Sequence, residues 1–203
     1  MRRRRRRVIL TGAWGGGKTT LLSELQANSD LAGKFLFLPE AAPLARRMGF
    51  DVGSPRFQAA VVQAQHALED VAEVRDGLRD DRIVISHRGS LDALAFWRLG
   101  DGESCDFFDL VESTRDAEFA RYDVVLLFQT CAGGVPEVYE SYRNHQPRPA
   151  AAEAARLEGL LEECWGCHPG FHRLVNGPNG WAEKSATAHR IIAALLQADA
   201  RMD

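Results

Sequence analysis

Short apolar runs alternate along the chain with longer stretches in which apolar residues recur at steps of three and four. Runs this short and wholly apolar are typical of strands that are buried on both faces of a parallel sheet. Four runs are clear and a fifth is weaker: Val8–Leu10, Phe35–Leu38, Ile83–Ile85, Val124–Phe128 and His172–Val175. The alternation predicts an α/β fold, with a mostly parallel five-stranded sheet between two layers of helices.

The longer stretches predict the helices that connect these strands. The strongest begins at Ser54-Pro55 and carries regularly spaced apolar residues as far as Leu78, before a polar turn. Further helices are expected over residues 19–27, 40–48, 91–99, 109–122, 151–164 and 181–200, and residues 129–150 are expected to be loop. Because there is no internal repeat and no long linker, residues 1–203 are expected to form one domain.

Charge is unevenly distributed along the chain. Arg2–Arg7 supply six of the 25 basic residues, which leaves 19 basic against 28 acidic residues elsewhere. An acidic body argues against general binding of nucleic acids, because their phosphates require basic surfaces. We expect residues 1–7 to be a solvated basic tail, while contact of the arginines with phosphate or with an acidic surface stays open. Lysine is rare and occurs only at Lys18, Lys34 and Lys184.

The sequence also suggests a compartment. No apolar run is long enough to cross a membrane, and the run after the arginines stops at Gly12, too early for a signal peptide. We therefore expect a cytoplasmic protein with no membrane partner, in which the four cysteines are reduced. Residues 164–168, Cys-Trp-Gly-Cys-His, match the C-x-x-C-H pattern of c-type haem attachment. Without signs of export, a structural coincidence is favoured over a redox pair, and a redox pair over haem.

The most informative motif lies between the first strand and the first helix. Gly12-Ala13-Trp14-Gly15-Gly16-Gly17-Lys18-Thr19 satisfies G-x-x-x-x-G-K-[ST], and Thr20 continues into the helix. Glycines let backbone N–H groups surround phosphate oxygens, and the helix N-terminus adds its positive dipole end. Lys18 can reach the outer phosphates, and the Thr19 hydroxyl can ligate Mg²⁺. The motif therefore predicts binding of ATP or GTP together with Mg²⁺.

The rest of the chain narrows the class of P-loop protein. A Ras-like GTPase needs D-x-x-G after a strand and N-K-x-D after a later one, and the sequence has neither. A large ring ATPase needs an acidic pair at the end of a strand, whereas Ile83–Ile85 is followed by Ser86-His87-Arg88. A small phosphotransferase remains, which needs a base beside the acceptor and arginines over the transferred phosphate.

Three polar residues fall where the carboxyl ends of parallel strands meet, which is the ligand-binding edge of such a sheet. Glu40 follows the second strand and could take the proton of an acceptor hydroxyl; the alternative is a residue that merely starts a helix. Arg88 follows the third strand, and Asp92 lies one helical turn further on. The two could form a structural ion pair, or they could hold phosphate and Mg²⁺.

Two further pairs of residues are weaker candidates. Arg143 and Arg148 could close over the γ-phosphate as part of a lid at about residues 130–165, although solvated loop arginines are the alternative. Gln58 and Gln63 on the long helix could read a base or an amide, but a polar helix face explains them equally well.

Together these pieces resemble the small AAA-type P-loop family that includes bacterial nicotinamide riboside kinase domains. Deoxynucleoside kinases and P-loop antibiotic phosphotransferases are similar at a greater distance. The matching pieces are Gly12–Thr19, Leu38–Ala42, Phe57-Gln58 with Gln63, Arg88–Ala95 and the segment 142–158. The resemblance spans nearly the whole chain. It implies a three-layer P-loop NTPase fold with strand order 2-3-1-4-5, Glu40 near the acceptor, Arg88 near phosphate and the long helix along the acceptor pocket.

The chain departs from this family pattern at one position. His87 stands where members usually carry Asp before the matching arginine. An imidazole is a poor Mg²⁺ ligand, so the metal is expected to rely on Thr19, the phosphates, water and Asp92. His87 itself is then expected to contact the acceptor or phosphate, or to orient Arg88.

We therefore expect a kinase that transfers the γ-phosphate of MgATP or MgGTP to a hydroxyl of a nucleoside-like or secondary-metabolite acceptor, antibiotics included. A monomer or a homodimer is expected. The alternative is a regulatory NTP-binding switch or slow NTPase that acts through a protein or lipid partner. An open pocket opposite the γ-phosphate, walled by Glu40, Arg88 and residues 55–80, would favour the kinase, because a switch would fill that space.

Overall fold

A parallel five-stranded sheet forms the centre of the molecule. The computed structural model describes residues 4–74, 82–134, 136–145 and 149–200. Its strands are β1 (Arg7–Thr11), β2 (Phe35–Leu38), β3 (Ile83–His87), β4 (Val124–Phe128) and β5 (Phe171–Leu174). They lie in the order β2-β3-β1-β4-β5, and every neighbouring pair is parallel. The predicted α/β class and strand order are thereby confirmed.

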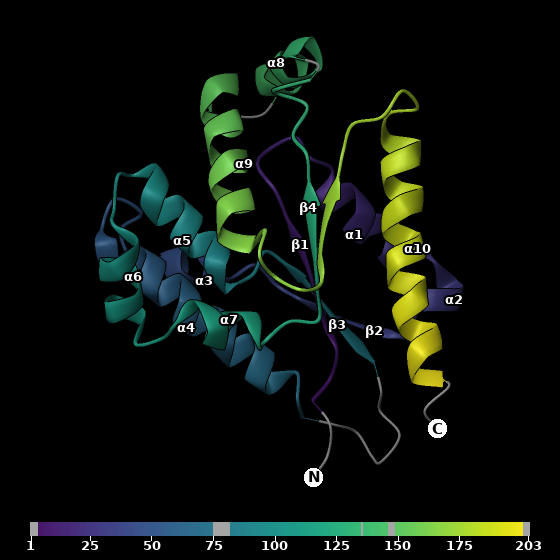
Figure 1. The fold of residues 1–203 in the computed structure, drawn as a ribbon, viewed down its shortest axis with the longest axis horizontal. Helices are drawn as coiled ribbons and strands as arrows, with labels where there is room; N and C mark the ends of the chain where they lie inside the picture. Colours follow the sequence, from purple (N-terminus) through teal and green to yellow (C-terminus); the bar gives the residue numbers. More distant parts are fainter. Residues whose placement is uncertain (1–3, 75–81, 135, 146–148, 201–203) are drawn as a thin grey trace.

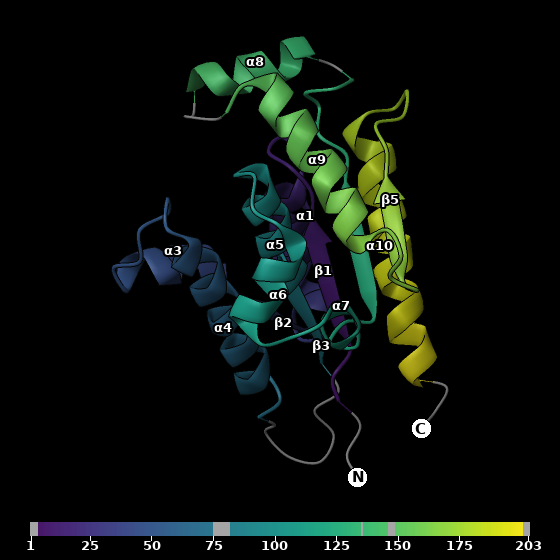
Figure 2. The ribbon, with the colours of Figure 1, turned by 60° about the vertical axis from the view of Figure 1, so that its left-hand side comes forward.

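Helices cover both faces of this sheet (Figure 1). One layer consists of α3 (Ala41–Arg47), α4 (Pro55–Val71), α5 (Ser90–Leu99), α6 (Ser104–Val111), α7 (Arg115–Phe119) and α9 (Ala151–Trp165). The other layer consists of α1 (Lys18–Ala27), α2 (Ser29–Ala32) and α10 (Trp181–Ala200). The remaining helix, α8 (Pro136–His145), lies beyond the carboxyl ends of the strands (Figure 2). In the part of the chain that the structure describes, none of these helices combines the length and the apolarity needed to cross a membrane.

The central strand β1 shows why both helical layers are needed. Ile9 is fully buried in one hydrophobic cluster with side chains of α5 and α9, among them Leu94. Its neighbours Val8 and Leu10 are fully buried in a second cluster with α1, which contributes Leu21. Successive side chains of a strand point to opposite faces, so an all-apolar strand is stable only when both faces are covered.

One predicted helix is wrong in its extent. Residues 109–122 do not form a single helix, because α6 ends at Glu112 in a left-handed conformation with φ 52°. The hydroxyl of Thr114 then accepts a hydrogen bond from the backbone N–H of Ala117 and caps α7. A new N-cap so close to a left-handed residue explains why the helical pattern is interrupted.

Two other boundaries also differ from the prediction. The segment 129–150, expected to be loop, contains α8, which begins at Pro136, a residue favoured in the first turn of a helix. Helix α4 ends at Val71 rather than at Leu78, and Leu78 lies outside the described residues. The side chain of Val71 is exposed, so this residue belongs to the apolar sequence pattern but does not pack on the core.

The expectation of a solvated arginine tail is wrong for the part of it that the structure describes. Arg5 is 2% exposed and Arg7, the first residue of β1, is 4% exposed. The Arg7 guanidinium lies 2.9 Å from a carboxylate oxygen of Glu69 and 2.9 Å from one of Glu73, both next to or within α4. For Arg7, the acidic surface left open as a partner therefore belongs to this chain itself.

Glu69 is the centre of this buried charge cluster. Its side chain is 1% exposed and accepts hydrogen bonds from Arg7, from Arg121 at 2.7 Å, from the Tyr122 hydroxyl at 2.8 Å and from the Gln65 amide at 2.9 Å. Burial and the charge of Glu69 raise the pKa of Tyr122 well above its ordinary value, so the hydroxyl stays a donor. Loss of this one carboxylate charge would take from Arg7 and Arg121 the buried counter-charge that they share.

We predict that Glu69→Gln lowers the free energy of unfolding by about 3 kcal/mol, since it uncouples a buried ion pair. Asp70→Asn is the matched control, because Asp70 is the next residue, its side chain is 75% exposed, and it lies 3.7 Å from Arg121. That exposed pair should contribute less than about 1 kcal/mol. Urea denaturation at neutral pH measures both. Equal effects of the two variants would contradict a special role for Glu69.

Candidate functional site

The glycine-rich loop between β1 and α1 packs tightly against the end of β4. A Cβ atom at Gly12 would lie 2.4 Å from the carbonyl oxygen of Phe128, and one at Gly16 would lie 2.7 Å from the same atom. Gly12, Gly15 and Gly17 have φ values of 136°, 75° and 100°, a region that side chains disfavour. The loop can therefore take this shape only with glycine at these positions.

Lys18 begins helix α1 and lies across the loop. It is 6% exposed, and its Nζ donates hydrogen bonds to the carbonyl oxygens of Gly12 at 2.7 Å and Ala13 at 2.8 Å. Gly17 precedes the helix and supplies no side-chain cap, so no side chain satisfies the first N–H groups of α1 there. A lysine beside uncapped helix N–H groups is an arrangement suited to phosphate.

A cavity of about 760 Å³, which we call the P-loop cavity, opens above this loop. That volume is within the range of small-molecule sites. Its walls come from the loop, from the ends of β2 and β3, and from segments after β4 and β5: Trp14, Gly15, Gly16, Gly17, Lys18, Thr19, Thr20, Glu40, His87, Arg88, Cys131, Val138, Asn176, Gly177, Gly180, Trp181 and Lys184. The structure thus brings the predicted residues Lys18, Thr19, Glu40, His87 and Arg88 together.

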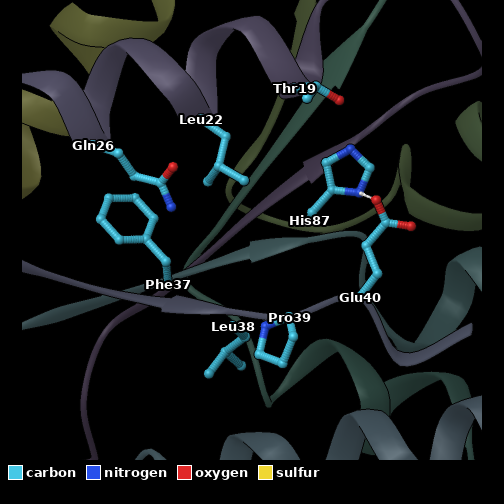
Figure 3. Close-up of a pocket in the computed structure, with 8 residues that line it drawn as sticks. All are labelled: Thr19, Leu22, Gln26, Phe37, Leu38, Pro39, Glu40 and His87. Carbon is cyan, nitrogen blue, oxygen red and sulfur yellow. Dashed lines mark ion pairs between the residues drawn. The ribbon is translucent and has the colours of Figure 1, made fainter. Parts of the chain in front are cut away.

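Glu40 and His87 face each other at the ends of β2 and β3 (Figure 3). The Nδ1 atom of His87 lies 2.8 Å from Oε1 of Glu40. Glu40 is also the N-cap of α3, but its carboxylate caps no helix N–H group, so the helix-start interpretation does not describe its side chain. The side chain points to His87 instead.

The two groups affect each other's ionisation. Burial lowers the pKa of His87, and the charges of Lys18 and Arg88 lower it further, although Glu40 opposes this shift. Contact with His87 lowers the pKa of Glu40, although burial opposes that shift. Near neutral pH the pair therefore consists of an uncharged imidazole and a carboxylate, and a carboxylate can accept a proton.

Arg88 is held in an unusual backbone conformation. Its φ is 79°, in the left-handed region that a residue with a side chain rarely adopts. The Arg88 carbonyl accepts a hydrogen bond from the Ser86 hydroxyl at 2.7 Å, and its guanidinium lies 3.0 Å from Asp92 and 4.9 Å from the centre of the Phe96 ring. Strain of this kind persists only where the surroundings fix it, and it is common at functional sites.

Asp92 is buried beside Arg88, and its expected metal role stays a prediction. It is 2% exposed and does not line the P-loop cavity. Its carboxylate accepts hydrogen bonds from Thr11 at 2.7 Å, Arg88 at 3.0 Å, the Gly89 N–H at 3.1 Å and Trp165 at 3.0 Å. One of these four donors is the Arg88 guanidinium, so the carboxylate helps to hold Arg88 in place.

The structure places Gln58 and Gln63 away from the cavity and leaves the two lid arginines untested. Gln58 and Gln63 on α4 are absent from its walls, and Gln63 is exposed, which agrees with the polar helix face. Arg143 belongs to α8, but its side chain lies outside what the structure describes, as does all of Arg148. Their role in a lid stays a prediction, although Val138 of α8 does line the cavity.

Lys184 of α10 is a site residue that sequence reasoning missed. It is 4% exposed, and its Nζ donates hydrogen bonds to the carbonyl oxygen of Gln129 at 2.8 Å, to that of Gly16 at 3.4 Å and to the side chain of Asn176. Burial lowers the pKa of its ammonium group. Lys184 thus joins the P-loop to the ends of β4 and β5. The rarity of lysine was the only signal for it in the sequence.

Trp181 supports the P-loop from the same helix. A Cβ atom at Gly17 would lie 2.1 Å from a ring carbon of Trp181, so the indole packs directly on the loop. Its ring stacks on Phe128, and its Nε1 donates a hydrogen bond to Glu24 of α1 at 2.7 Å. The start of α10 therefore contacts both the P-loop and helix α1.

The C-x-x-C-H sequence has a structural role. None of the four cysteines, all of which lie in the described residues, forms a disulfide, and burial raises the pKa of Cys164 to about 11, which disfavours its reactive thiolate. The Nε2 atom of His168 lies 3.2 Å from the carbonyl oxygens of both Phe119 and Tyr122. In the described ranges no three or more His, Cys, Asp or Glu side chains are grouped to hold a metal.

Comparisons with known proteins agree with this geometry. A family model described as an AAA domain matches residues 7–170, and the chain therefore belongs to this family of P-loop domains. Among solved structures, the chain is similar to the crystal structure of NadR protein in complex with NR, with a TM-score of 0.60 and 17% sequence identity. A search of curated proteins finds no match.

The similarity to NadR covers 93% of this chain and 50% of the NadR chain, so this chain spans about half the length of that protein. At this identity the likeness establishes the fold. Together with the family match it confirms the predicted P-loop NTPase fold and the predicted family, and it supports a nucleotide-binding P-loop domain.

We predict that Lys184→Met weakens binding of MgATP or MgGTP at least about tenfold, or about 1.4 kcal/mol. The reason is that three backbone and side-chain oxygens around the P-loop lose their common donor. Lys34→Met is the control, because Lys34 is exposed and lies outside the cavity. Isothermal titration calorimetry measures both. A folded Lys184→Met protein with unchanged nucleotide affinity would contradict this role.

Proposed function

We propose that this protein is a phosphotransferase that moves the γ-phosphate of ATP or GTP to a hydroxyl group of a small molecule. The supporting observation is a second cavity of about 300 Å³ that shares Thr19, Glu40 and His87 with the P-loop cavity. We call it the α1–β2 pocket, and its walls are Thr19, Leu22, Gln26, Phe37, Leu38, Pro39, Glu40 and His87. A kinase needs acceptor space beside the phosphates, whereas a switch does not.

Residues of the loop suit the nucleotide. Backbone N–H groups of the loop and of the α1 N-terminus would bind the phosphates. The Lys18 ammonium group would move from the carbonyl oxygens of the loop to the outer phosphates of the nucleotide. Thr19 is exposed at the start of α1 and offers the hard oxygen that Mg²⁺ prefers. Bound there, Mg²⁺ would neutralise phosphate charge.

The proposed reaction is a direct transfer. The Glu40 carboxylate accepts the proton of the acceptor hydroxyl, and the hydroxyl oxygen forms a bond to the γ-phosphorus. The bond from the γ-phosphorus to the bridging oxygen breaks, and the nucleoside diphosphate leaves with that electron pair. Lys18 and Arg88 stabilise the transferred phosphate, and Asp92 holds Arg88 in place.

The acceptor class remains a proposal as well. We propose a nucleoside-like or secondary-metabolite alcohol, which includes antibiotics. The long helix α4, expected to wall the acceptor site, lines neither the P-loop cavity nor the α1–β2 pocket. The expected α4 wall is thus not found in either cavity, and we propose that the acceptor lies between Glu40 and α1 instead.

We predict that Glu40→Gln lowers phosphoryl transfer at least about 100-fold and leaves nucleotide affinity nearly unchanged, because the variant loses only the proton acceptor. Glu103→Gln is the control, since Glu103 is also an exposed helix N-cap without a side-chain cap bond, but lies outside both cavities. Phosphorus NMR of reactions with a panel of alcohols measures transfer. Full transfer by Glu40→Gln would remove Glu40 as the base, and hydrolysis without transfer to any alcohol would favour a slow NTPase.

A further inference from the structure

The α1–β2 pocket has a lining that indicates what it binds. We propose that it is the acceptor site, and that it takes a small uncharged alcohol with an apolar ring or chain and an amide-like group at the end away from the hydroxyl. This inference deepens the proposed function and rests on it.

The walls of the pocket are mainly apolar. Leu22 projects from α1, and Phe37, Leu38 and Pro39 come from β2 and the turn after it (Figure 3). The volume of about 300 Å³ is at the small end of ligand sites. Burial of an apolar ring or chain against these side chains would supply most of the binding free energy.

Polar groups stand at two separate ends of the pocket. Figure 3 shows the Gln26 side chain extending towards Phe37 on one side of Leu22, and the contact between Glu40 and His87 on the other side. An amide can both donate and accept hydrogen bonds, so Gln26 suits a ligand amide or a similar group. A ligand held at both ends would place its hydroxyl beside Glu40, next to the P-loop cavity.

The charge of the lining selects against acids. Lys18 and Arg88 line the P-loop cavity but are absent from the walls of the α1–β2 pocket, where Glu40 is the only ionised group. No basic side chain stands in these walls to pair with an anionic acceptor, and the Glu40 carboxylate would repel it. The donor phosphates are thereby directed to the P-loop cavity, and an uncharged acceptor to the α1–β2 pocket.

His87 gives independent support for a ligand. Its side chain is 9% exposed; Nδ1 contacts Glu40 at 2.8 Å, whereas the buried Nε2 atom has no hydrogen-bond partner among the described residues. Buried polar atoms are rarely left without a partner, because that costs free energy. A polar group of a ligand in this pocket would supply the missing partner.

Two probes of the same shape test the selectivity of the pocket: 4-(hydroxymethyl)benzamide, which is uncharged, and 4-(hydroxymethyl)benzoate, which is an anion. Ligand-observed NMR titrations of the full chain, with and without a non-hydrolysable MgATP analogue, give both affinities. We expect the benzamide to bind at least about tenfold more tightly than the benzoate. Equal or tighter binding of the benzoate would overturn the proposal.

Variants of α1 locate the binding. Leu22→Trp should abolish benzamide binding by filling the pocket, whereas Ser23→Trp, which introduces the same side chain at the next and exposed position, should leave it unchanged. Gln26→Leu changes an exposed residue and should fold; it should remove most of the preference for the benzamide over benzyl alcohol. Undiminished benzamide binding by folded Leu22→Trp, or an unchanged preference in Gln26→Leu, would contradict the assignment.

Nucleotide titrations of the same proteins separate the two proposals. If the wild-type chain binds the nucleotide but not the benzamide, the pocket assignment fails and the proposed function stands. If it binds the benzamide but neither ATP nor GTP, the proposed function fails, and the pocket remains a site for uncharged alcohols.

Discussion

The site depends on how closely the glycine-rich loop approaches the end of β4. Gly12 and Gly16 both lie so near the Phe128 carbonyl that a single added carbon atom would collide with it. From the other side Trp181 covers Gly17, and Lys184 bonds to the Gly16 carbonyl. These contacts hold the loop from both sides, and a loop held by its own protein loses little conformational freedom when it binds a phosphate.

A second constraint reaches the site from within the sheet. The buried carboxylate of Glu69 accepts from Gln65, Gln65 donates to the Ser86 hydroxyl at 2.9 Å, and Ser86 donates to the carbonyl of Arg88. This continuous chain of hydrogen bonds connects the buried charge cluster around Glu69 with Arg88, the strained residue beside the P-loop cavity. A left-handed Arg88 is stable because the chain from Ser86 and the ion pair with Asp92 fix it from two directions.

Sequence patterns predict the parts of this protein that follow from local chemistry. Four clear strands and the P-loop could be predicted because apolar runs and the G-x-x-x-x-G-K-[ST] spacing are local signals. The positions and hydrogen bonds of Asp92 and Lys184 could not be predicted, because each depends on partners from distant segments. Examples are Trp165 for Asp92 and Gln129 for Lys184. The burial of Arg7 was missed for the same reason, since a run of arginines gives no sign of the carboxylates it will meet.

Calorimetric titration of ATP and GTP with Mg²⁺ into the wild-type chain and into Lys18→Ala tests the central claim, that this loop binds nucleotide phosphates. We expect that the wild type binds at least one of the two nucleotides, and that Lys18→Ala loses at least about tenfold in affinity, or about 1.4 kcal/mol. The control is that both proteins unfold cooperatively with similar stability. Absence of binding by the wild type, or equal affinity of a folded Lys18→Ala protein, would contradict the account.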